Sequence, residues 1–124
     1  MGPTEVVATY GAAWSETDET KRRDLLTKAW AADGTYLDPT GRADGREALV
    51  QHIGGFQQML PGHSIELASG IDEHDSYLRF AWKMIGPDEA VVMEGVDFGA
   101  LDSDGKLKSI VGFFGPWPEA TAES

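Results

Sequence analysis

The sequence predicts an α+β fold, in which three helices precede four long strands. Before His63, apolar side chains recur every three or four residues, as they do on one face of a helix. From His63 onward they alternate every second residue, as they do on one face of a strand. The chain has 124 residues, 41% of them hydrophobic, which suits one domain with one core. We therefore expect a single domain over residues 1–124, in which 116–124 form a loose tail.

Three segments before His63 have the spacing of helices. The first is expected from about Thr4 to Ser15. The second begins at one of the capping residues within 17–20, and Asp33-Gly34 is a typical helix end. The third begins at Asp44, which has an acidic residue three positions later as in a capping box, and ends at Pro61-Gly62.

Strands and turns account for the remainder of the chain. One short strand is expected before Asp38-Pro39, because the residue before a proline avoids helical backbone angles. Residues 40–45 are expected to form a loop. After His63, turn-forming residues at 72–75, 86–88 and 102–105 separate the four alternating strands.

Asp97 lies within the predicted strand 91–101 and shares one face with Met93, Gly95 and Gly99. A carboxyl group on such an apolar face must border a cavity or be neutral, since burying an unpaired carboxylate costs many kcal/mol. The opposite face, which includes Val96, is also apolar and can equally be the core face. This strand alone does not distinguish the two interpretations.

Composition excludes several classes of function. The formal net charge of -11 disfavours binding to nucleic acids and to anionic membranes. There is no cysteine, and no pair of histidines has the spacing of a metal site, so we expect no metal and no cofactor. We expect a cytoplasmic protein, because the sequence has neither a signal peptide nor a long apolar run.

Three single residues, Tyr10, Asp38 and the Asp97 just described, are candidates for chemistry or for purely structural roles. Tyr10 lies on the apolar stripe of the first helix, where a buried hydroxyl needs a partner. Asp38 precedes a proline, and an aspartate in that position commonly forms a turn. His52 lies beside the apolar stripe of the third helix, and we expect it to flank the helix rather than to act as a catalyst.

The order of elements resembles the NTF2-like superfamily, which includes SnoaL-like polyketide cyclases and ketosteroid isomerases. The resemblance extends over roughly Val6 to Pro116 and depends on Asp38-Pro39-x-Gly41, the helix beginning Gly45-Arg46-Glu47-Ala48-Leu49, and the final strand meander. It implies a cystatin-like cone, in which three N-terminal helices pack on a curved, mainly antiparallel sheet that encloses a pocket. It also implies a homodimer, formed through the exposed face of the sheet.

Within this superfamily, the positions of Tyr10, Asp38 and Asp97 resemble the catalytic residues of ketosteroid isomerase. The resemblance implies that Asp38 is the base that moves a proton between carbons of an enone. It also implies that Tyr10 and a protonated Asp97 donate hydrogen bonds to the enolate oxygen. A SnoaL-like cyclase would need an acid on the last strand, but Gly112 and its neighbours offer none.

We therefore expect a cofactor-free proton-transfer enzyme acting on a small apolar carbonyl compound. The alternative is a non-catalytic module that binds an apolar ligand, or a SnoaL-like cyclase or hydrolase. Seven large side chains are expected to bind the ligand: Trp14, Trp30, Phe56, Phe80, Trp82, Met84 and Phe114.

Overall fold

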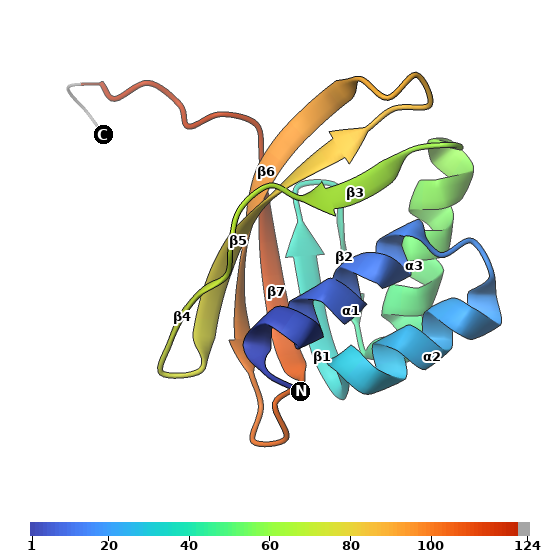
Figure 1. Cartoon of the computed structure of the whole chain (residues 1–124), viewed down its shortest axis with the longest axis vertical. Coiled ribbons are helices and arrows are strands. Elements are labelled where there is room, and N and C mark those ends of the chain that lie inside the picture. The colour runs from blue at the N-terminus through green and yellow to red at the C-terminus, as the bar shows by residue number, and fades with distance from the viewer. Residues whose placement is uncertain (122–124) are drawn as a thin grey trace.

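Three helices pack on one side of a curved sheet in the computed structural model, which describes residues 1–121 (Figure 1). The elements in chain order are α1 (Pro3–Ser15), α2 (Glu19–Ala29), β1 (Trp30–Asp38), β2 (Gly41–Asp44), α3 (Arg46–Met59), β3 (Ser64–Leu67), β4 (Asp72–His74), β5 (Tyr77–Ile85), β6 (Val91–Leu101) and β7 (Leu107–Phe114). The predicted α+β class is confirmed. After β7 the chain leads away from the sheet without regular structure as far as residue 121, and the last part of the predicted tail, 122–124, lies outside the described residues.

The seven-stranded sheet has the order β2-β1-β7-β6-β5-β3, with β4 also paired to β5. Only the β1–β7 pair is parallel among the described strands, so the sheet is mainly antiparallel as predicted. Two of the observed strands, β2 and β4, lie where the sequence predicted a loop and a turn. Residues of the predicted loop form β2, and Asp72–His74 pair with β5 because the turn narrows to Asp75 and Ser76, whose φ angles are 50° and 67°.

The second helix ends at Ala29, so the predicted end at Asp33-Gly34 is wrong. Trp30 leaves the helix because it pairs with Leu107 of β7, and its carbonyl oxygen accepts hydrogen bonds from Arg46 at 2.7 and 3.0 Å. These tertiary contacts override the local helical pattern. The predicted capping box is also wrong, because Asp44 pairs with Thr35 in the β1–β2 hairpin.

The core lies between the helices and the inner face of the sheet. Its largest fully buried side chains are Trp30, Leu26, Leu49, Ile53, Leu107, Ile110, Val6, Val7 and Val50. On β6, Gly95, Asp97 and Gly99 are buried, whereas Val92 is exposed. The face that contains Asp97 therefore points inward, which decides between the two interpretations of this strand.

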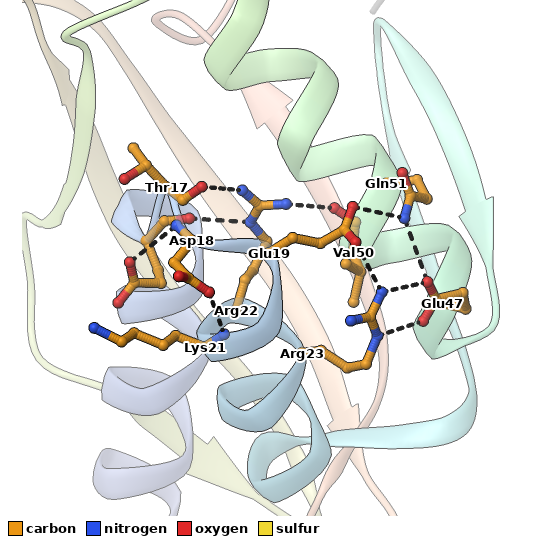
Figure 2. Close-up of polar contacts among 10 residues, drawn as sticks. Thr17, Asp18, Glu19, Lys21, Arg22, Arg23, Glu47, Val50 and Gln51 are labelled. Carbon is orange, nitrogen blue, oxygen red and sulfur yellow. Dashed lines mark hydrogen bonds and ion pairs between the residues drawn. The ribbon is translucent and has the colours of Figure 1, made fainter.

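Polar contacts hold α2 against α3 (Figure 2). The buried Arg22 guanidinium lies between Thr17 and Val50 and donates to both carbonyl oxygens, at 3.3 and 3.1 Å. Next to it, Arg23 donates two hydrogen bonds to the carboxylate of Glu47, at 2.7 and 2.9 Å. Arg22 and Arg23 thus fix α2 and α3 to one another.

Candidate functional site

A cavity of about 440 Å³ lies between the inner face of the sheet and helices α1 and α3. Six of the seven predicted ligand-binding side chains line it: Trp14, Phe56, Phe80, Trp82, Met84 and Phe114. Trp30 does not line it. Its ring is fully buried and stacks against the Tyr10 ring, with centroids 5.5 Å apart and planes 17° apart, so Tyr10 separates it from the cavity.

Tyr10, Asp38 and Asp97 all border this cavity, although they come from three separate elements. Asp97 of β6 pairs with Gly112 of β7, and Asp38 follows the Leu37–Val111 pair of β1 and β7. A Cβ atom on Gly112 would lie 2.9 Å from the Asp97 Oδ1 atom and 3.5 Å from the Asp38 Cβ atom. The two carboxyl groups therefore belong to one row across three adjacent strands. Because strands lie about 4.8 Å apart, their backbones are roughly 10 Å apart, a span that one small ligand can bridge.

Asp97 is buried with a single hydrogen bond from the described residues. The Trp82 Nε1 atom donates to Asp97 Oδ1 at 2.9 Å, and only 6% of the residue is exposed. Burial raises the pKa of the Asp97 carboxyl to about 7. The Trp82 hydrogen bond lowers the pKa in part, while the negative charge of Asp38 raises it further. Asp97 therefore changes its protonation state near neutral pH.

Asp38 has both carboxylate oxygens occupied. Its Oδ2 atom accepts from the Tyr36 hydroxyl at 2.5 Å. Its Oδ1 atom accepts from the Thr40 backbone N–H, the Thr40 hydroxyl and the Gly41 N–H, at 2.7, 2.6 and 3.1 Å. Burial alone would raise the pKa of Asp38, but the facing His52 imidazole and the donors from Thr40 and Tyr36 hold it well below its usual range.

Tyr10 is a buried donor at the wall of the cavity. Burial raises the pKa of its hydroxyl well above the ordinary value, and the nearby charges of Asp97 and Asp38 contribute to the rise. The hydroxyl therefore stays protonated at any physiological pH, which is the state that can donate a hydrogen bond to a ligand oxygen.

Tyr36 and His52 also line the cavity. Sequence reasoning missed Tyr36 and placed His52 on the flank of the helix. The His52 Nε2 atom is 3.9 Å from Asp38 Oδ2, and the His52 and Tyr36 rings have centroids 5.2 Å apart. His52 thus faces the cavity and does not merely flank the helix. The available signals were weak: Tyr36 is two residues before Asp38 on one strand face, and His52 is four residues before Phe56 on one helix face.

This arrangement combines a carboxyl that titrates near neutrality, neutral hydroxyl donors and apolar walls. No lysine or arginine is among the described residues that line the cavity, so it suits neutral ligands better than anionic ones. Within residues 1–121, no cluster of His, Cys, Asp or Glu could hold a metal ion. No helix in that part of the chain is long and apolar enough to cross a membrane.

No protein-family model matches the sequence, and no curated protein matches it closely. Solved structures do match. One is a provisionally named isomerase of the SnoaL-like family from Agrobacterium tumefaciens, 35% identical over 90% of this chain and 96% of that chain, with a TM-score of 0.86. An NTF2-like protein of unknown function from Cytophaga hutchinsonii is 13% identical over 94% of this chain and 92% of that chain, with a TM-score of 0.66.

A provisionally named polyketide cyclase from Sinorhizobium meliloti is 16% identical over 87% of this chain and 93% of that chain, with a TM-score of 0.69. At such identities the second and third matches show the fold alone. The first match extends over nearly the whole of both chains at an identity that shows common family membership. The chain therefore belongs to the SnoaL-like family, and its fold is NTF2-like.

Proposed function

We propose that this protein is a cofactor-free enzyme that moves a proton within a small apolar carbonyl compound, as ketosteroid isomerases do. The observation that carries the proposal is the row formed by Asp38, Gly112 and Asp97, which faces one apolar cavity beside Tyr10. The name of the Agrobacterium relative, an isomerase, agrees with this class of reaction.

The reaction requires two kinds of group, and the cavity offers both. A base must remove a proton from the carbon next to the carbonyl, and a donor must stabilise the negative charge that develops on the carbonyl oxygen. Two carboxyl groups are available as the base, and the hydroxyl of Tyr10 is available as the donor. Apolar walls exclude water and so strengthen such hydrogen bonds.

Cyclohex-3-en-1-one is a suitable test compound, because moving one proton converts it to a conjugated enone that absorbs in the ultraviolet. The wild-type protein is expected to accelerate this conversion, whereas a variant carrying both Asp38→Asn and Asp97→Asn is not. Equal rates for the two proteins, with both correctly folded by circular dichroism, would exclude the enzyme proposal.

A second candidate function is binding of an apolar ligand without catalysis. It is favoured by the aromatic lining of the cavity, which needs no carboxyl group to hold a ligand. In that case both aspartates can be replaced by asparagine without loss of affinity for the neutral dye N-phenyl-1-naphthylamine. A cyclase or hydrolase has less support, since β7 presents Gly112 at the row where an acid is needed.

The protein is also proposed to form a homodimer through the outer face of the sheet. Exposed apolar side chains on this face include Tyr77, Val92, Val111 and Phe113. Such a patch is typical of an interaction surface. Sedimentation at micromolar concentration should show a species of twice 13.4 kDa, and Phe113→Glu should shift it toward the monomer. A wild-type monomer at that concentration would contradict the proposal.

A further inference from the structure

We propose that Asp97 is the catalytic carboxyl that exchanges a proton with the substrate, and that Asp38 is a positioning residue. This assignment rests on the proposed function and reverses the roles that the resemblance to ketosteroid isomerase implies. It follows from the difference in how the protein surrounds the two carboxyl groups of the row.

Asp38 is held as part of the β1–β2 turn. Three donors from Thr40 and Gly41 converge on one of its oxygens, and the Tyr36 hydroxyl occupies the other. To accept a proton from a substrate, the carboxylate would have to give up at least one of these hydrogen bonds. A carboxylate stabilised in this way is a weak base. Its contacts instead fix Tyr36 at the cavity wall, with the His52 imidazole opposite.

Asp97 has the opposite surroundings. Its one hydrogen bond from the described residues comes from Trp82, and it points into the cavity. Glycine explains how Trp82 reaches it: a Cβ atom on Gly95 would lie 2.2 Å from Trp82 Cζ2, so the indole ring lies across Gly95. On the other side the carboxyl lies against Gly112, where a Cβ atom would be 2.9 Å from Asp97 Oδ1, and Asp97 lines the cavity. A substrate carbon can therefore approach Asp97 without displacing another side chain.

The titratable groups that line the cavity with Asp97 are Tyr10 of α1, Tyr36 and Asp38 of β1, His52 of α3 and the exposed Glu66 of β3. Burial keeps both tyrosine hydroxyls neutral, so the ionised Asp38 is the nearby negative charge that affects Asp97. Together with burial, this charge places the Asp97 pKa at about 7, where a base is most effective under physiological conditions.

The proton balance needs no other reactant. The Asp97 carboxylate takes a proton from the carbon next to the carbonyl, the electron pair of that C–H bond forms a double bond to the carbonyl carbon, and the π pair of the carbonyl passes to its oxygen. The Tyr10 hydroxyl donates a hydrogen bond to that oxygen. The carboxylic acid of Asp97 then returns the proton to the far carbon of the allylic system as the carbonyl double bond forms again.

The kinetic test uses 5-nitrobenzisoxazole, a neutral aromatic carbon acid. A base removes its single C–H proton on the five-membered ring, the N–O bond breaks, and a coloured phenolate forms. For the wild type, kcat/KM should rise with pH with an apparent pKa near 7. We expect Asp97→Asn to lower kcat/KM by about 10²–10⁴-fold, the usual contribution of a general base. Asp38→Asn should be less active than the wild type but keep the rise, shifted to lower pH because the Asp38 charge that raises the pKa of Asp97 is removed.

Trp82→Phe provides a test of the same carboxyl without removing it. Loss of the Trp82 donor should shift the rise in kcat/KM to higher pH, because that hydrogen bond favours the ionised form. Tyr36→Phe, which removes a donor to Asp38 instead, should leave the position of the rise unchanged.

A nuclear magnetic resonance titration gives a readout independent of turnover. The indole N–H signal of Trp82, identified by its absence in Trp82→Phe, should move with an apparent pKa near 7 in the wild type. In Asp38→Asn it should still move, but at lower pH, because the Asp38 charge is removed. In Asp97→Asn it should not move over this range. A signal that does not titrate between pH 5 and 9 in the wild type would overturn the assignment.

Failure of the assignment is distinguishable from failure of the proposed function. If Asp97→Asn turns over both test compounds while Asp38→Asn does not, the protein is a proton-transfer enzyme whose base is Asp38. If the wild type turns over neither compound faster than the variant that lacks both carboxyl groups, the proposed function fails and the assignment of the base fails with it.

Discussion

The interior has two regions of similar composition that are filled very differently. In the closed region, Trp30, Leu26, Leu49, Leu107 and Ile110 are fully buried, and none of them lines the cavity. In the open region, large side chains surround a space of about 440 Å³ and several remain partly exposed: Phe56, Met59, Leu60, Leu67 and Phe114. The comparison teaches that apolar side chains alone do not make the site. The site lies where short polar side chains of the sheet, Asp38 and Asp97, face Gly11 of α1 and Gly55 of α3 across the space.

The largest expected difference between the two regions is in stability. Trp30→Ala removes a fully buried ring from the closed region and should lower the free energy of unfolding by about 3–5 kcal/mol. Phe80→Ala removes a ring that borders the cavity, and it should cost less than about 3 kcal/mol because part of the ring already faces empty space. Urea denaturation of both variants measures the difference. Equal losses would mean that the cavity wall is packed as tightly as the closed region.

The second prediction compares the two aspartates of the open region through the pH dependence of stability. The pKa of Asp97 is raised by folding from 3.8 to about 7, so the folded state binds its proton more tightly than the unfolded state does. Its contribution to stability is fully present below about pH 4 and is lost as pH rises through 7. Between pH 5 and 8 the wild type should lose about 2–3 kcal/mol through this group.

Asp97→Asn should remove this loss, so the variant gains stability relative to the wild type as pH rises from 5 to 8. Asp38→Asn is the matched control. Because folding lowers the pKa of Asp38, that residue is ionised in both states throughout this range, and its contribution fades only as pH falls below about 4. Thermal unfolding at pH 5 and pH 8 compares the three proteins. Parallel behaviour of Asp97→Asn and the wild type would show that Asp97 is not the buried titrating group.

Local patterns in the sequence predicted the parts of the fold that local patterns control. The alternation of Leu78, Phe80, Trp82 and Met84 gave the inward face of β5 correctly, because one face of that strand is clearly more apolar. The end of α2 depends instead on pairing with a distant residue, that of Trp30 with Leu107. No pattern within about ten residues contains that information.

In the candidate site, too, local patterns predicted some features, and contacts between separate elements determine the others. The orientation of Asp97 was undecidable from its own strand, because both faces of β6 are apolar, and it is set by Trp82 on the neighbouring strand. Asp38 was recognised by its Asp-Pro turn, but the donors that weaken it as a base come from residues whose approach depends on the hairpin. His52 reaches Asp38 only because α3 packs beside β1, so its place in the cavity is a property of the fold.

The smallest expected effect concerns Gly112, the residue that separates the two carboxyl groups. Gly112 belongs to the same strand as the fully buried Ile110, yet it has no side chain to fill the interior. In Gly112→Ala the new Cβ atom would lie 2.9 Å from the Asp97 Oδ1 atom, so that carboxyl must shift and the space between the two aspartates narrows. We expect about tenfold weaker binding of N-phenyl-1-naphthylamine, equivalent to about 1.4 kcal/mol, with little loss of stability.

Gly70→Ala, at an exposed position with open space around it, should bind the dye as the wild type does. Unchanged affinity in Gly112→Ala would mean that ligands occupy the aromatic part of the cavity without reaching the row of carboxyl groups.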